Sequence, residues 1–306
     1  SVKDQGATLE GRFAFANEIV HLHFRIIDNY VYGADPAPSL RNLPYGPNIR
    51  QRLDVYLAKS STLTPVAVYF HGGAWLRGDK SDLRGHHRFL DAGISVIAVD
   101  YRYIPSENPD ATTHDMARAI QFIRHHASTW NLDPHRLGVW GVSAGACTSL
   151  WLGTHPDLAD PTSPDPISRQ STRPTCVSAI APQTSLDPIQ MRAWVGPQLI
   201  YGPHAFALKS FAAFLAQRDQ LRPWINAYSP AALLTKTSAP IFLDYLNFGL
   251  QPYDPASGYY THSPRFGIGF LELAKKRNAE CYLHYEGHEA DRYTSWHQFL
   301  IEKLRN

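Results

Sequence analysis

The chain has 306 residues, of which 44% are hydrophobic and 18% charged, and its formal net charge is +2. This is the composition of a globular protein and excludes a collagenous or disordered chain. Lys and Arg form no cluster that would suit a nucleic-acid backbone, so we expect no nucleic-acid partner. No run of about 18 apolar residues occurs, so we expect a soluble protein without a membrane span, cytoplasmic or secreted after signal removal.

Short apolar runs rich in β-branched and aromatic residues alternate with helical patterns along the chain. Because strand and helix alternate, the sequence predicts an α/β fold with a mostly parallel central sheet flanked by helices. The predicted strands are 66–70, 94–99, 137–140, 177–180, 241–246 and 281–285, with a weaker signal at 53–57. The predicted helices are 111–126, 144–152, 206–217, 264–276 and 291–304.

Two proline-containing stretches interrupt this alternation. Prolines recur through 155–175, which predicts a surface loop without long helices or central strands. The stretch 186–235 falls between two predicted strands, and we interpret it as a cap inserted over the sheet. The sequence therefore predicts one domain over 1–306 that contains a cap at 186–235.

The segment Gly141-Val142-Ser143-Ala144-Gly145 follows a predicted strand and precedes a predicted helix. A nucleophilic serine on such a sharp turn needs small neighbours, because its backbone is strained and passes close to the next strand. The dipole of the following helix favours the negative charge of an acyl-transfer intermediate. We therefore predict Ser143 as a nucleophile. The alternative is a glycine turn with no catalytic role.

A second glycine-containing turn, His71-Gly72-Gly73-Ala74-Trp75, follows the strand at 66–70. Paired glycines let backbone N–H groups point into a cavity, where they can hold an oxyanion. We predict an oxyanion hole made by the N–H groups of Gly72, Gly73 and Ala144. We interpret His71 as a structural residue of the turn.

These two motifs, with Asp100-Tyr101-Arg102 between them, resemble the hormone-sensitive lipase and carboxylesterase branch of the α/β-hydrolases. The lead-in 133–139 is similar to that of feruloyl esterases, acetyl-xylan esterases and kynurenine formamidase. The turn departs from the branch at Val142, where Glu or Asp is common, and at Ala146, where Gly is common. The resemblance extends over nearly the whole chain and implies the α/β-hydrolase fold.

The resemblance also implies a late histidine base and an acid in the loop after the strand at 241–246. His288 follows the last predicted strand and is the candidate base. Asp254 is the candidate acid. Asp187 remains an alternative, and Asp244 is expected to lie inside a strand and point elsewhere.

The predicted reaction is hydrolysis of a small-molecule carboxylic ester through an acyl-enzyme on Ser143, and it requires no cofactor and no metal. Trp75 and Tyr253 are candidate substrate contacts. The open alternatives are an arylformamidase-like amide hydrolase and a non-catalytic binding protein on the same fold. The oligomeric state is not predicted.

Overall fold

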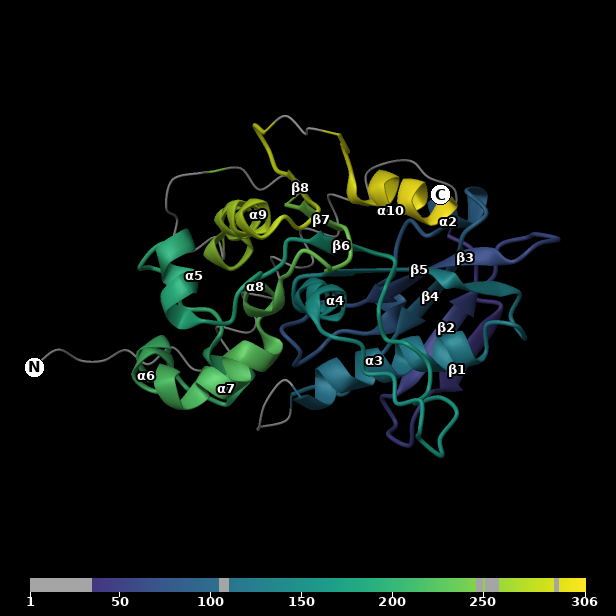
Figure 1. Ribbon diagram of the computed structural model, residues 1–306, viewed down its shortest axis with the longest axis horizontal. Helices are drawn as coiled ribbons and strands as arrows, with labels where there is room; N and C mark the ends of the chain where they lie inside the picture. Colours follow the sequence, from purple (N-terminus) through teal and green to yellow (C-terminus); the bar gives the residue numbers. More distant parts are fainter. Residues whose placement is uncertain (1–34, 105–109, 246–249, 251–258, 289–291) are drawn as a thin grey trace, which may run out of the picture.

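The computed structural model describes residues 35–104, 110–245, 250, 259–288 and 292–306 (Figure 1). Its described residues form an eight-stranded sheet in the order β1-β2-β4-β3-β5-β6-β7-β8. The strands are β1 (Leu40–Pro44), β2 (Arg52–Tyr56), β3 (Thr64–Phe70), β4 (Ser95–Val99), β5 (Leu132–Val142), β6 (Cys176–Ile180), β7 (Ile241–Asp244) and β8 (Cys281–His284).

In sheet order, the strands β4, β3, β5, β6, β7 and β8 run parallel to one another, whereas β1 pairs antiparallel with β2, and β2 pairs antiparallel with β4. The central strands β3, β4 and β6 are buried along their whole length, because helices cover both faces of the sheet. This arrangement confirms the predicted α/β-hydrolase fold. The carboxyl ends of the parallel strands meet at one edge, where such sheets place their functional residues.

The α-helices are α2 (His87–Asp91), α3 (Asp110–His125), α4 (Ala144–Thr154), α5 (Pro188–Val195), α6 (Phe211–Ala216), α7 (Arg218–Tyr228), α8 (Pro230–Leu233), α9 (Arg265–Arg277) and α10 (Trp296–Arg305). Three short 3-10 helices are η1 (Lys80–Asp82), η2 (Pro203–Phe206) and η3 (Tyr259–His262). Figure 1 shows α2 and α10 together on one face of the sheet and α3 and α4 on the other. No helix within the described ranges is long and apolar enough to cross a membrane.

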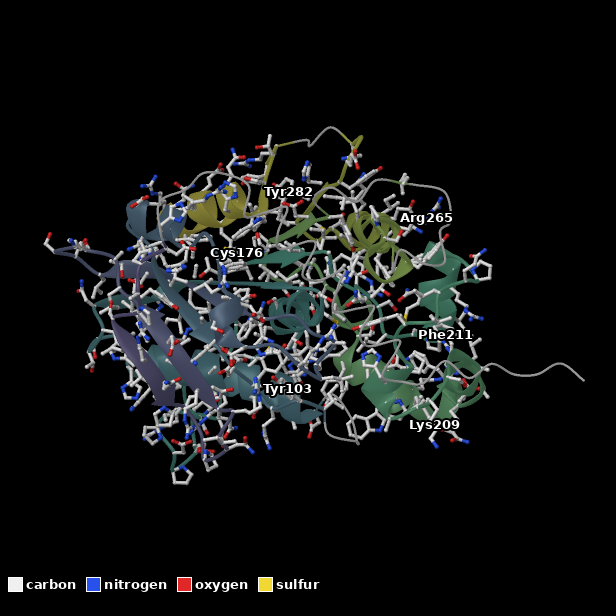
Figure 2. All side chains as sticks on the ribbon, turned by 180° about the vertical axis from the view of Figure 1, so that it is seen from behind. Tyr103, Cys176, Lys209, Phe211, Arg265 and Tyr282 are labelled. Atoms are coloured by element: carbon white, nitrogen blue, oxygen red, sulfur yellow. The ribbon has the colours of Figure 1, made fainter. Side chains whose placement is uncertain are left out.

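The segment between β6 and β7 holds α5, η2, α6, α7 and α8, which all lie within the predicted cap at 186–235. Several hydrogen bonds join it to the main body. Among them, the Trp151 indole of α4 donates to the Ala227 carbonyl at 2.8 Å, the Tyr228 hydroxyl bonds to Asp110, and Arg277 of α9 donates to the Ala231 carbonyl at 2.9 Å. In Figure 2, Lys209 and Phe211 of this segment lie at the far end of the molecule from Cys176 of β6. Whether the segment acts as a cap stays a prediction.

The predicted elements differ from the observed ones mainly at their boundaries, but several observed elements were not predicted, namely strand β1 and helices α2, α5, α7 and α8. Helix α7 runs through Pro223, although a proline in a helix interior removes a helical hydrogen bond. Helix α10 begins at Trp296 instead of 291, because the hydroxyl of Ser295 caps it by accepting from the Gln298 N–H. The loop predicted at 155–175 is confirmed, since neither helix nor strand lies between α4 and β6.

Candidate active site

Ser143 lies between β5 and α4, where the chain turns sharply. Its backbone has φ 52° and ψ −114°, a strained combination for any residue with a side chain. The turn is fixed on both sides, because the Ser143 N–H donates to the Ile180 carbonyl at 2.9 Å and its carbonyl accepts from the Cys147 N–H at 2.9 Å. The predicted strand, turn and helix around Ser143 are therefore all present.

The glycines of this turn are required by the close approach of α4 to β3. A Cβ on Gly145 would lie 2.2 Å from the Phe70 carbonyl oxygen and 2.4 Å from that of His71. A Cβ on Gly141 would lie 2.5 Å from the Gly145 carbonyl carbon. These contacts involve backbone atoms that no side-chain movement can relieve. The sequence folds this way locally because both residues lack a side chain.

The second predicted turn lies directly beside the first. A Cβ placed on Gly72 would be 3.6 Å from the Cβ of Ser143, so the backbone of Gly72 faces the candidate nucleophile. The next three residues have positive φ: 98° at Gly73, 55° at Ala74 and 58° at Trp75. Two consecutive strained non-glycine residues persist only where their surroundings hold them.

Trp75 is one of the groups that hold this turn. Its indole is 1% exposed and its Nε1 donates to the Thr148 hydroxyl of α4 at 3.0 Å. Its carbonyl accepts from the Ile104 N–H at 2.9 Å. These contacts give Trp75 a structural task; its suggested contact with substrate stays a prediction.

His71 is fully buried, as expected of a structural residue. Its Nδ1 lies 2.8 Å from the Gly72 carbonyl, and its ring stacks on Tyr101 with 4.0 Å between ring centroids. Burial lowers the pKa of His71 to about 4, so the ring is neutral at pH 7. A neutral ring that bonds a carbonyl through Nδ1 carries its proton on that nitrogen.

His288 follows β8 in a tight turn, in which its N–H donates to the Tyr285 carbonyl at 3.1 Å. Its ring stacks on that of Tyr285 at 4.7 Å. The His288 Nδ1 is buried and has no hydrogen-bond partner among the described residues. No hydrogen bond joins His288 to Ser143 within this part of the chain, although β5 and β8 end at the same edge of the sheet, three strands apart.

Tyr253, the candidate substrate contact, and Asp254, the candidate acid, lie outside the described residues. The two other acids that were considered are both engaged elsewhere. Asp187 caps α5 and forms a two-bond ion pair with Arg218, at 2.9 and 2.6 Å. Asp244 lies in β7 as expected, is 1% exposed, and bonds to His284 of β8 at 2.9 Å.

Charge-assisted hydrogen bonds hold the loop after β4 in place. The Arg102 guanidinium bonds to the Asp115 carboxylate at 2.6 and 2.9 Å. Asp100 accepts from the Lys80 N–H at 2.7 Å, and burial raises its pKa to about 6. Sequence reasoning missed Lys80, whose ammonium lies 3.6 Å from both Asp54 and Asp100. Lys80 begins the short helix η1, and no sequence pattern indicates that its side chain bridges two distant aspartates.

His204, a partly buried residue of the cap segment, was also missed. The His204 ring lies 6.1 Å from the Trp75 indole and 4.7 Å from the Tyr201 ring. Burial lowers the pKa of His204 to about 4, against the effect of a hydrogen bond to the Ala74 backbone. No pattern in the cap sequence distinguishes His204, since the turn of Trp75 is distant in the chain.

Comparison with known proteins assigns the chain to a family. The sequence profile of the BD-FAE family matches residues 53–244, which is more than half of the chain and includes both glycine turns. The chain belongs to the BD-FAE family. This family of α/β-hydrolase carboxylesterases confirms the resemblance drawn from the two motifs. The match ends before His288 and Asp254, so these two assignments stay predictions.

Individual relatives of this BD-FAE member are similar over shorter stretches. The probable isoprenylcysteine alpha-carbonyl methylesterase ICMEL1 of Arabidopsis thaliana is 37% identical over 109 residues, which are 35% of this chain and 23% of that protein. The carboxylesterase NlhH of Mycobacterium tuberculosis is 36% identical over 83 residues, 26% of each chain. The chain thus spans about a quarter of the length of the curated relatives it matches.

Solved structures agree on the fold over most of the chain. The acetyl ester-xyloside bifunctional hydrolase of Caldicellulosiruptor lactoaceticus has a TM-score of 0.62 at 22% identity, covering 90% of this chain and 92% of that one. A truncated carbohydrate esterase from gut microbiota has a TM-score of 0.65 at 16% identity, covering 89% and 99%. At these identities the likeness shows the α/β-hydrolase fold alone.

Proposed function

We propose that this chain hydrolyses carboxylic esters through an acyl-enzyme on Ser143. The observation that carries the proposal is the strained backbone of Ser143 at φ 52°, in contact range of Gly72 of the second turn. Strain of this kind costs about 1–3 kcal/mol and persists where function uses the position. Membership of the BD-FAE family and the ester hydrolases among its relatives support the same chemistry.

The proposed reaction gives each of these groups one role. Ser143 attacks the ester carbonyl while His288 takes its proton, and the oxyanion rests on the N–H groups of Gly72, Gly73 and Ala144. The protonated imidazole then gives its proton to the leaving alcohol, and water releases the acid by the reverse steps. His288 Nδ1 has no hydrogen-bond partner among the described residues, and the partner proposed for it is Asp254, which would fix the tautomer of the ring.

The test is hydrolysis of p-nitrophenyl acetate by the purified chain and by its Ser143→Ala variant, with circular dichroism to compare their folding. We expect the variant to lose all but a residual fraction of the activity, because the nucleophile is gone. Equal hydrolysis by both folded proteins would disprove the acyl-enzyme on Ser143. Absence of activity in both would favour the binding-protein alternative.

A comparison of two substrates distinguishes an ester hydrolase from an arylformamidase-like enzyme. Ester and amide substrates need the same nucleophile and oxyanion donors, so the leaving group alone separates them. We expect kcat/KM for the acetyl ester to exceed that for N-formylkynurenine. The opposite order would support the amide hydrolase.

A further inference from the structure

We infer that Tyr101 is a positioning residue, whose buried hydroxyl orients the peptide groups that supply the oxyanion hole. The inference rests on the proposed function and adds a residue that neither the motifs nor the family match assigns to the site. Tyr101 follows β4, and the oxyanion turn follows β3. Because these strands are parallel neighbours with Phe70 paired to Val99, the segments that follow them leave the sheet side by side.

The orientation of a backbone N–H is set by the carbonyl of the same peptide group. A trans peptide is planar, and its C=O and N–H point in opposite directions. The N–H of Gly72 shares a peptide with the carbonyl of His71, and the N–H of Gly73 shares one with the carbonyl of Gly72. Whatever holds these two carbonyls therefore aims the two proposed oxyanion donors.

The carbonyls of His71 and Gly72 both accept hydrogen bonds, from the Tyr101 hydroxyl and from the His71 ring that stacks on Tyr101. The Tyr101 hydroxyl donates to the His71 carbonyl at 2.5 Å and lies 3.3 Å from the Gly72 carbonyl. The Gly72 carbonyl also accepts from His71 Nδ1 at 2.8 Å, and that imidazole stacks on the Tyr101 ring with an interplanar angle of 15°. One tyrosine thus fixes the first peptide directly and supports the histidine that fixes the second.

The burial of Tyr101 suits it to orienting the two peptides and prevents its side chain from touching substrate. Its side chain is fully buried, and burial raises the pKa of its phenol well above the ordinary value, so it remains a donor at all working pH values. Its own carbonyl accepts from Arg50 Nε at 3.1 Å, which fixes its backbone. Preorganised donors need no rearrangement when negative charge develops, and this is the origin of their catalytic effect.

The test is Tyr101→Phe, which removes the hydroxyl and keeps the ring on His71. Tyr245→Phe is the matched control, because the Tyr245 hydroxyl is also buried and donates to a backbone carbonyl, that of Pro182, at 2.9 Å, but bonds neither to an oxyanion peptide nor to the backbone of Tyr101. With p-nitrophenyl acetate we expect Tyr101→Phe to lower kcat roughly 10- to 100-fold, somewhat less than loss of an oxyanion donor, with KM nearly unchanged. Tyr245→Phe should keep kcat within about twofold of the original value.

A second readout does not depend on turnover. In protein labelled with ¹⁵N-glycine, we expect the amide signals of Gly72 and Gly73 to shift in Tyr101→Phe and to stay in place in Tyr245→Phe. If Tyr101→Phe does not fold, His71→Phe replaces it, since it keeps a stacked ring and removes the donor to Gly72. The kinetic expectation for His71→Phe is the same.

The outcomes separate this inference from the proposed function. Unchanged kcat in Tyr101→Phe, or an equal loss in Tyr245→Phe, overturns the positioning role while ester hydrolysis stands. If the original protein hydrolyses no ester, the proposed function fails, and the glycine signals still decide whether Tyr101 orients the two peptides.

Discussion

At the scale of single residues, the structure separates the acids that the sequence left open. Asp187 forms an ion pair with Arg218, and Asp244 bonds to His284, whereas the Nδ1 of His288 lacks a partner within the described part of the chain. The sequence could therefore identify Ser143 and its turns from local motifs. The acid has no such motif, because it is defined only by its distance from His288.

We expect Asp254→Asn to lower kcat on the order of 10⁴-fold, because the amide favours the wrong tautomer of the base. The measurement is kcat for p-nitrophenyl acetate. The control is Asp187→Asn, which loses the ion pair with Arg218 and should cost about 1 kcal/mol or less of stability with kcat unchanged. Loss of activity in Asp187→Asn with full activity in Asp254→Asn would reverse the assignment.

At the scale of elements, the sequence predicted the buried strands and the helices that pack on them, because their apolar patterns are local. It missed α7, where Pro223 indicates a helix end, and it missed β1, whose side chains are mostly exposed. The packing of α4 against β3 also follows from sequence, since Gly141 and Gly145 are what permits it.

Gly145→Ala should force α4 away from β3, because the new methyl would lie 2.2 Å from the Phe70 carbonyl. We expect a loss of about 3 kcal/mol in the free energy of unfolding, within the range known for overpacked sites. Urea denaturation followed by circular dichroism measures it.

Gly138→Ala in β5 is the matched control for this substitution. Its nearest neighbours are the side chains of Cys176 and Leu300, at 3.1 Å, and side chains can move by a few tenths of an ångström. Equal destabilisation by the two substitutions would contradict the role given to the backbone contact of Gly145.

At the scale of the whole molecule, the pKa values of buried groups predict loss of stability in acid. Burial lowers the pKa of His71, His204 and His297 to about 4, below the ordinary value near 6.5. Between pH 6.5 and 4 the unfolded chain binds protons at these sites and the native chain does not, so stability falls as pH falls. Asp100, with a pKa raised to about 6, acts in the opposite direction but is one group against three.

The urea midpoint should therefore decrease from pH 7 to pH 4.5. In His204→Phe the decrease should be smaller, because one of the three histidines is gone. A midpoint that is constant or rises over this range would contradict the neutral buried state of these rings.

The position of the cap segment is the part of the molecule that sequence could not predict. His204 meets the turn of Trp75 only through tertiary packing, and its place in the sequence gives no sign of this contact.

The order of the strands has one more consequence. The proposed nucleophile follows a central strand, whereas the proposed base follows the four-residue strand β8, which lies at the edge of the sheet that the described residues form and has β7 as its one neighbour there. Edge elements open at lower free energy than the centre of a sheet. Heating should therefore inactivate the protein reversibly before it unfolds: activity should fall at a temperature where the circular dichroism of the sheet is still intact, and amide exchange in β8 should precede that in β5.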